Sequence, residues 1–296
     1  MTTIAFIGLG VMGLPMATHL VAAGHDVVGV NRRPGPRDQL VRAGGRAAAD
    51  AHEAATEADV VITMLPDSPD VEAVMLGDDG VLAHMRKGAL HIDMSSIAPS
   101  SARRVAESAR AVGVEPLDAP VSGGQAGALA GNLSVMVGGE RSTFDRAEPV
   151  LAVMGTTVRY LGPSGSGQTV KAANQLVVAG IIELVSEALV FLHAYDVDLP
   201  TATSVLAGGL AGNRVLDLKS AGMLAHEFEP GFRLELHHKD LTNLLDAARS
   251  AEVALPVGSL VAQLLGAAKA QGSGALDHSA LLLEVERLSA RNIARR

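Results

Sequence analysis

Residues 3–13 read TIAFIGLGVMG, and this stretch decides the fold of the first half of the chain. Its apolar run from Ile4 to Ile7 is typical of a strand that is buried on both faces. A glycine-rich turn follows, Gly8-Leu9-Gly10-Val11-Met12-Gly13, and a helical pattern then runs from Leu14 to Ala23. The glycine spacing alone is weak, but between a strand and a helix it is the fingerprint of a dinucleotide-binding turn. We therefore predict that this turn holds a cofactor pyrophosphate at the amino end of the helix; the alternative is a glycine-rich turn without a ligand.

The end of the second expected strand, residues 26–30, bears on the choice of cofactor. NAD-binding chains usually carry an acidic residue here, which binds the ribose 2′-hydroxyl. This chain has Asn31 instead, followed by Arg32 and Arg33 and later by Arg37. A guanidinium group can bind a 2′-phosphate through two hydrogen bonds. We therefore expect NADP(H) to be preferred, with NAD(H) as the second choice; a solvated basic turn is the alternative, more for Arg37 than for Arg32.

Strand and helix patterns alternate through the rest of the first half. The expected strands cover residues 60–64, 89–93, 114–117, 133–137 and 158–161, and the expected helices cover residues 70–76, 100–112 and 142–154. This alternation predicts an α/β fold with a doubly wound parallel sheet of the Rossmann type. Ligands bind at the carboxyl ends of the strands in such sheets, so we expect the cofactor to contact Leu65, Pro66 and Ser96.

A second glycine-containing segment, residues 118–124, follows the strand at 114–117. Ser122, Gly123 and Gly124 can present a hydroxyl group and successive backbone N–H groups to a small anion. The same three residues would also serve as a flexible turn.

The second half of the chain opens with Gly165-Ser166-Gly167-Gln168-Thr169-Val170-Lys171-Ala172-Ala173-Asn174 and continues into an apolar run from Leu176 to Leu192. Apolar residues fall on nearly every face of this expected helix, so we predict that it is buried between domains or between subunits. It is not a transmembrane span, because Glu183 and Glu187 would lie in its middle. Lys171 and Asn174 share one face of the helix, where the lysine either reaches to the surface or takes part in chemistry.

After this helix the strand patterns stop. Five further helices are expected, over residues 201–207, 215–224, 234–250, 257–270 and 278–291, with Asp277 as a cap for the last. We therefore predict a dinucleotide-binding Rossmann domain over residues 1–163 and an all-helical domain for the substrate and for dimerisation over residues 164–296.

Composition excludes several classes of protein. The chain has 296 residues, of which 48% are hydrophobic and 19% charged, so it is not disordered. The net charge of −8 and the scattered basic residues argue against a nucleic-acid partner. The absence of cysteine excludes disulfides and thiolate sites and suits the cytoplasm. No membrane partner is expected. No metal is expected either, because the adjacent His237 and His238 point in different directions on a helix and no third ligand stands at a useful spacing.

Five segments together resemble the β-hydroxyacid dehydrogenase family: residues 8–13, 118–124, 165–174, 208–212 and 239–241. The resemblance extends along the whole chain. It implies that Lys171 is the catalytic residue, that Asn174 is its neighbour in the active site, and that Lys239 contacts the cofactor. It also implies that Ser122 to Gly124 bind the carboxylate of a small substrate.

Residues 92–99, 230–233 and 277–281 resemble the branch of the family that reduces tartronate semialdehyde (2-hydroxy-3-oxopropionate) to glycerate. Oxidation of 3-hydroxyisobutyrate or a related β-hydroxyacid is the alternative reaction. Imine reductases have a similar plan but typically lack the lysine found here at Lys171. A non-catalytic nucleotide-binding protein is the alternative from another class. We also expect a homodimer or homotetramer, because the long apolar helix needs a partner surface.

Overall fold

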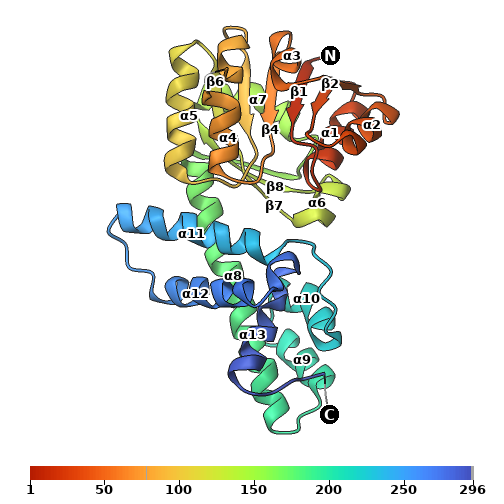
Figure 1. Ribbon diagram of the computed structural model, residues 1–296, viewed down its shortest axis with the longest axis vertical. Helices are drawn as coiled ribbons and strands as arrows, with labels where there is room; N and C mark the ends of the chain where they lie inside the picture. The colour runs from red at the N-terminus through yellow and green to blue at the C-terminus, as the bar shows by residue number, and fades with distance from the viewer. Residues whose placement is uncertain (78, 295–296) are drawn as a thin grey trace. The chain divides into compact units, whose positions relative to one another are not determined.

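The computed structural model describes residues 1–77 and 79–294 and divides the chain into two compact units (Figure 1). The first unit ends at Lys171 and the second begins at Ala172. The division falls inside the long helix α8 (Ser166–Ala194).

One mixed sheet forms the centre of the first unit. Its strands are β1 (Thr3–Ile7), β2 (Asp26–Val30), β3 (Arg46–Ala47), β4 (Val60–Thr63), β5 (Leu90–Asp93), β6 (Glu115–Asp118), β7 (Val121–Ser122), β8 (Ser134–Gly139) and β9 (Thr157–Gly162). They lie in the order β3-β2-β1-β4-β5-β6-β8-β7, and β9 also pairs with β8. The order reverses between β1 and β4, which is the switch point at which such sheets bind ligands.

The expectation of a wholly parallel sheet is wrong for β8, which runs antiparallel to both β6 and β7. The connection from β6 to β8 contains only β7 and the seven-residue helix α6 (Gly124–Ala130). Because it does not cross back over the sheet, the chain re-enters the sheet at the edge where β6 ended. This arrangement keeps Ser122 to Gly124 at the carboxyl edge of the parallel strands.

Helices cover both faces of the sheet. On one face lie α1 (Gly13–Ala22), α2 (Pro34–Arg42), α6 and α7 (Arg141–Leu151), and on the other lie α3 (Ala51–Thr56), α4 (Ser68–Leu76), α5 (Pro99–Ala111) and the 3-10 helix η1 (Val81–His84). Alternate strand residues supply the two cores: Phe6 and Ile62 pack on the first face, and Ala5 and Val61 on the second.

The second unit is helical, as predicted. After α8 it contains α9 (Leu199–Gly208), α10 (Arg214–Ala225), α11 (Leu234–Ser250), α12 (Pro256–Ala270) and α13 (Leu281–Leu288), with 3-10 turns at Ser273–Ala275 and His278–Ala280. The expected last helix, residues 278–291, is shorter than predicted. Its first turn is the 3-10 turn that the Asp277 side chain caps through the N–H of Ser279, and the α-helix ends at Leu288.

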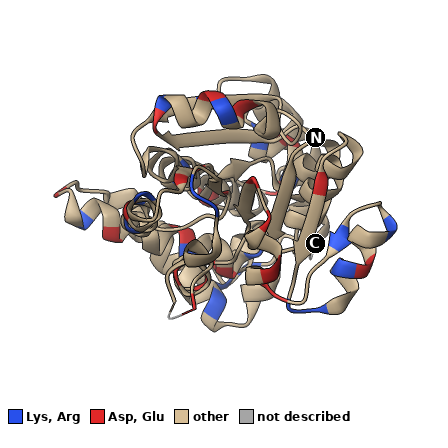
Figure 2. Cartoon of the chain, turned by 90° about the horizontal axis from the view of Figure 1, so that it is seen from above, with Lys and Arg blue, Asp and Glu red and all other residues tan. Residues whose placement is uncertain are grey.

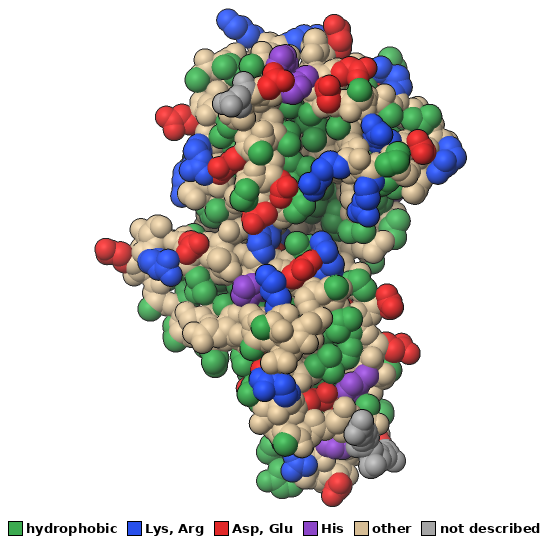
Figure 3. Space-filling view, in the orientation of Figure 1, with side chains coloured by type: hydrophobic (Ala, Val, Ile, Leu, Met, Phe, Trp, Pro, Cys, Tyr) green, Lys and Arg blue, Asp and Glu red, His purple; other side chains and the backbone are tan. Residues whose placement is uncertain are grey.

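Helix α8 is not buried on every face within a single chain. Ile182 and Leu189 are in the core of the second unit, but Val177, Leu184 and Phe191 are 58%, 63% and 62% exposed. These three residues are seven positions apart, so they form one stripe along the helix. Hydrophobic side chains are visible on the surface of the helical unit in Figure 3.

Helix α8 is long and apolar enough to cross a membrane, as are many core helices of soluble proteins. The buried Glu183 lies in the middle of the helix. Figure 2 shows Lys and Arg interspersed with Asp and Glu over the described residues, which fits the scattered charges of the sequence.

Candidate active site

The glycine-rich turn between β1 and α1 packs closely at its first and third glycines and is open at its second. A Cβ atom on Gly8, whose φ is +104°, would lie 2.3 Å from the carbonyl oxygen of Met64, and one on Gly13 would lie 1.9 Å from that of Gly8. A Cβ on Gly10 would meet nothing within 4 Å. Thus the first and third glycines are required for packing, whereas the turn is open at the second. No described side chain caps the amino end of α1, so its first N–H groups remain suited to an anion.

Asn31, at the end of β2, has a structural role that the sequence did not predict. Its Oδ1 accepts a hydrogen bond from the N–H of Leu9 over 3.2 Å, and its Nδ2 donates to the carbonyl of Arg33 over 3.0 Å. The carboxamide therefore holds the glycine-rich turn against the start of α2. Arg32 and Arg33 are exposed at the carboxyl edge of the sheet, and Arg37 lies with its Nη1 3.5 Å from the carbonyl oxygen of Ala48.

Buried polar groups fix the loops after β4 and β5. The hydroxyl of Ser95 accepts a hydrogen bond from the N–H of Leu65 over 2.9 Å, and the Ser95 N–H donates to Oδ1 of Asp93 over 3.2 Å. Thr63 donates its hydroxyl to the same oxygen over 2.8 Å. Burial raises the pKa of Asp93 to about 6 and lowers the pKa of the neighbouring His91 to about 4. The predicted cofactor contacts Leu65, Pro66 and Ser96 lie in these two loops.

The first turn of α8 is anchored by Asp118, the last residue of β6. Oδ1 of Asp118 accepts from the N–H of Gly165 over 2.7 Å, and Oδ2 accepts from the N–H of Gln168 over 2.9 Å. A Cβ on Gly167 would lie 2.6 Å from the carbonyl oxygen of Asp118, so glycine is needed for this close approach. Burial raises the pKa of Asp118 to about 6, although the backbone hydrogen bonds oppose the rise.

Gln168 ties the same turn to the loop after β5. Its Oε1 accepts from the N–H of Ile97 over 3.1 Å, and its Nε2 donates to the carbonyl of Ser95 over 2.8 Å. Lys171, three residues further along α8, is only 9% exposed. Our reading of the sequence missed the anchoring by Asp118 and Gln168, although both residues lie inside segments that it singled out.

The remaining predicted site residues of the first unit are Ser122, Gly123 and Gly124. Ser122 is the last residue of β7 and pairs with Ser134 of β8. Gly123, at φ +132°, and Gly124, at φ +60°, turn the chain into α6 in a conformation that favours glycine. Ser122 and Gly124 are half-buried and Gly123 is exposed, so the segment is accessible to a small anion.

In the second unit, Asn174 and Lys239 belong to one polar chain. Asn174 donates its Nδ2 to Oε1 of Gln175 over 2.8 Å, and Gln175 donates to Oδ2 of Asp240 over 2.7 Å. The Lys239 ammonium lies 2.8 Å from Oδ1 of the same carboxylate. Asp240 is therefore both the ion-pair partner of Lys239 and, through Gln175, a support for Asn174. The buried His237 contacts the carbonyl oxygen of Gln175 through Nε2 over 3.1 Å.

Comparison with known proteins identifies the family. Residues 3–162 match the sequence-family model of the NAD binding domain of 6-phosphogluconate dehydrogenase. Residues 165–285 match the family model for the NAD-binding domain of NADP-dependent 3-hydroxyisobutyrate dehydrogenase. The 2-hydroxy-3-oxopropionate reductase of Escherichia coli K12 is 38% identical over 98% of this chain and 99% of its own. The chain belongs to the β-hydroxyacid dehydrogenase family.

Solved structures agree with this membership. The 3-hydroxyisobutyrate dehydrogenase of Mycobacterium tuberculosis, solved with L-serine, is 37% identical and superposes with a TM-score of 0.87 over 96% of this chain and 98% of its own. Psf3, solved with NADP+ and 2-OPP, is 26% identical and superposes with a TM-score of 0.86 over 95% of this chain and 99% of its own. As a β-hydroxyacid dehydrogenase, the chain is an oxidoreductase that uses a nicotinamide cofactor and acts on a small substrate. The open position at Gly10 and the uncapped α1 fit such a cofactor.

Proposed function

We propose that this β-hydroxyacid dehydrogenase reduces 2-hydroxy-3-oxopropionate to glycerate, with Lys171 as the proton donor. The observation that carries the mechanism is the position of Lys171: it is nearly buried, in a helix whose first turn is held at the carboxyl edge of the dinucleotide-binding sheet by Asp118 and Gln168. The choice of substrate rests on the 38% identity with the Escherichia coli reductase over nearly the whole chain.

The nicotinamide, when bound, supplies the hydride that adds to the aldehyde carbon. Negative charge then develops on the aldehyde oxygen, and the Lys171 ammonium stabilises that charge and delivers a proton to the oxygen. In the reverse direction the neutral amine takes the proton back. Lysine suits both directions better than arginine, because guanidinium gives up its proton too reluctantly.

The other predicted residues bind and orient the reactants. The Ser122 hydroxyl and the backbone N–H groups of Gly123 and Gly124 bind the substrate carboxylate. Asn174, one helical turn after Lys171, orients the substrate beside the ammonium group. Gly8 to Gly13 bind the pyrophosphate, and Leu65, Pro66, Ser96 and Lys239 provide further cofactor contacts.

We infer that NADPH is preferred over NADH. Asn31 occupies the position of the usual acidic residue, and its carboxamide is engaged with the backbone of Leu9 and Arg33. No carboxylate therefore stands at this position to repel a 2′-phosphate. The exposed guanidinium of Arg32 can bind that phosphate.

Initial rates with NADPH and NADH against a panel of small aldehyde acids test the proposal. A site that hydrogen-bonds the hydroxyl of 2-hydroxy-3-oxopropionate should reject the methyl analogue strongly, because its buried polar groups would be left unpaired. Higher kcat/KM for the 3-hydroxyisobutyrate pair would favour that substrate instead. NADPH binding without turnover of any carbonyl acid would indicate a nucleotide-binding protein without catalytic activity.

A further inference from the structure

Two histidines that the proposed reaction does not use lie at the edge of the sheet opposite the cofactor turn. His52 is in α3, which leads into the amino end of β4, and His84 is in η1, which leads into the amino end of β5. The glycine-rich turn and the Leu65 and Ser95 loops follow the carboxyl ends of the same sheet. The histidine pair is therefore remote from the proposed chemistry within the first unit.

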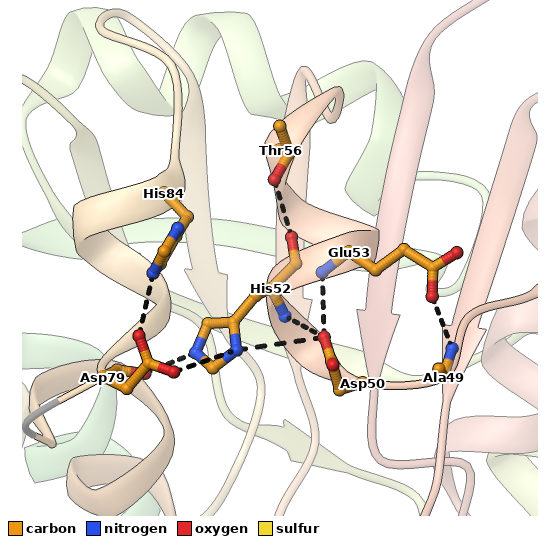
Figure 4. A network of polar contacts seen from close by, with 7 residues as sticks. All are labelled: Ala49, Asp50, His52, Glu53, Thr56, Asp79 and His84. Atoms are coloured by element: carbon orange, nitrogen blue, oxygen red, sulfur yellow. Dashed lines mark hydrogen bonds and ion pairs between the residues drawn. The ribbon is translucent and has the colours of Figure 1, made fainter.

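The Asp79 side chain lies beside both imidazole rings and contacts each of them (Figure 4). Nε2 of His84 is 3.1 Å from Oδ1 of Asp79, and Nδ1 of His52 is 3.7 Å from Oδ2 of the same carboxylate. The ring centroids are 4.6 Å apart. One possible ligand atom from each of these three residues lies within 4.8 Å of the other two.

The orientation of His52 is fixed from both sides. Its Nε2 hydrogen-bonds the backbone carbonyl oxygen of Asp79. A carbonyl oxygen only accepts, so Nε2 carries the hydrogen and the lone pair of the neutral ring is on Nδ1. Nδ1 faces the Asp79 carboxylate and also lies 3.8 Å from Oδ1 of Asp50. The lone pair of Nδ1 and the two carboxylates would repel one another, so a cation among these three groups, either a proton or a metal ion, would be stabilising.

Asp50 is also held in place. Its Oδ1 accepts hydrogen bonds from the N–H groups of His52 and Glu53, over 3.0 Å and 2.9 Å, and so caps α3. Two imidazoles and a carboxylate therefore converge from two helices and the turn before η1, with a second carboxylate beside them. A hydrogen bond from the far ring nitrogen to a carbonyl oxygen is the usual support of a metal-binding histidine.

We propose that His52, His84 and Asp79 bind a divalent transition-metal ion of the Zn²⁺ class, with Asp50 or water as the fourth ligand. Zinc binds imidazole and carboxylate ligands at about 2.0–2.2 Å, which separates tetrahedral ligand atoms by about 3.4 Å. The 3.1 Å and 3.7 Å separations bracket this value, so small side-chain rotations complete the site. Imidazole ligands select against Mg²⁺ and Ca²⁺, which prefer oxygen. The ion would tie α3 to η1 and so stabilise the first unit.

Titration calorimetry with ZnCl₂ on the untagged, chelator-treated full-length chain tests this site. We expect one Zn²⁺ per chain for the wild type, at least about tenfold weaker binding for His84→Gln and Asp79→Asn, and no binding of MgCl₂. His193→Gln, which removes a histidine of α8 outside the cluster, should bind Zn²⁺ like the wild type.

Thermal unfolding provides the second readout. Zn²⁺ should raise the unfolding midpoint of the wild type and of His193→Gln but not that of His84→Gln, because an ion that binds only the folded chain stabilises it. Turnover without added Zn²⁺ should be the same in all three proteins. Absence of Zn²⁺ binding by the wild type, or equal affinity in the wild type and both cluster variants, would overturn the proposal.

Discussion

Replacing Asp118 with asparagine keeps the shape of the side chain but removes the charge that anchors α8. In the wild type the N–H groups of Gly165 and Gln168 donate to the Asp118 carboxylate over 2.7 Å and 2.9 Å. The asparagine amide keeps one acceptor oxygen, but its NH₂ group faces one of these two N–H groups. Leaving one of these buried N–H groups without an acceptor costs about 1–3 kcal/mol. The charge itself is unfavourable: burial raises the pKa of Asp118 from 3.8 to about 6, which corresponds to about 3 kcal/mol at neutral pH.

These terms oppose each other and nearly cancel at pH 7, so Asp118→Asn should change the free energy of unfolding by no more than about 2 kcal/mol there. At lower pH the variant should become less stable relative to the wild type. The pKa of Asp118 is higher in the folded chain than in the unfolded chain. Protonation of Asp118 therefore stabilises the fold fully below pH 3.8, and this stabilisation is lost as the pH rises through about 6. The variant has no such group, so its free energy of unfolding relative to that of the wild type should fall by up to about 3 kcal/mol between pH 7 and pH 4.

Urea unfolding of both proteins at pH 7, 5.5 and 4 measures this difference, and steady-state kinetics at pH 7 measures the effect on the site. We expect kcat to fall by about tenfold or more, because a displacement of about 1 Å in a catalytic group can cost a hundredfold. The Kd for NADPH should stay within about twofold, since Gly8 to Gly13 are untouched. A stability difference that does not change with pH, or an unchanged kcat, would refute the anchoring role of Asp118.

Three further predictions concern the cofactor, the assembly and the metal. Arg32→Ala should raise the KM for NADPH and leave that for NADH nearly unchanged, while Arg42→Ala, on α2, should alter neither; equal effects of Arg32→Ala on both cofactors would mean that this arginine does not bind the 2′-phosphate. Light scattering should give a mass of at least twice 30.4 kDa, because the exposed stripe at Val177, Leu184 and Phe191 favours a partner surface. Leu184→Lys should lower that mass and Val41→Lys, on the exposed face of α2, should not; a wild-type mass near 30 kDa would contradict this assembly. Zn²⁺ should protect the wild type, but not His84→Gln, against thermal unfolding.

Much of the fold could be predicted because its signals are local. The apolar run, glycine-rich turn and helix at residues 3–23 lie together in the sequence. In the second half, the helical pattern of apolar residues continues over long stretches. Helix α2 was not predicted, because Pro34, Gly35 and Pro36 are residue types that are common in turns, although proline is also well suited to the first turn of a helix. The direction of β8 was also missed, since a strand pattern with a period of two carries no direction.

The supports of the candidate site could not be predicted, because they are contacts between distant residues. Asp118 and Gly165 are 47 positions apart, and His52 and His84 are 32 apart, so only the folded sheet brings each pair together. The sequence does show that Lys171 and Asn174 share a helical face, but not that Gln168 and Asp118 hold the first turn of that helix.

The turnover number of Lys171→Arg tests the central claim most directly. If Lys171 delivers the proton to the developing alkoxide, kcat should fall by roughly a hundredfold or more, because the variant keeps the charge but not a proton that is readily given up. The Kd for NADPH and the midpoint of thermal unfolding should change little, and Lys87→Arg, at an exposed position, should keep the wild-type kcat. A lysine that only extends to the surface from a buried helix would tolerate arginine. Near-native kcat in Lys171→Arg would therefore contradict the proposed mechanism.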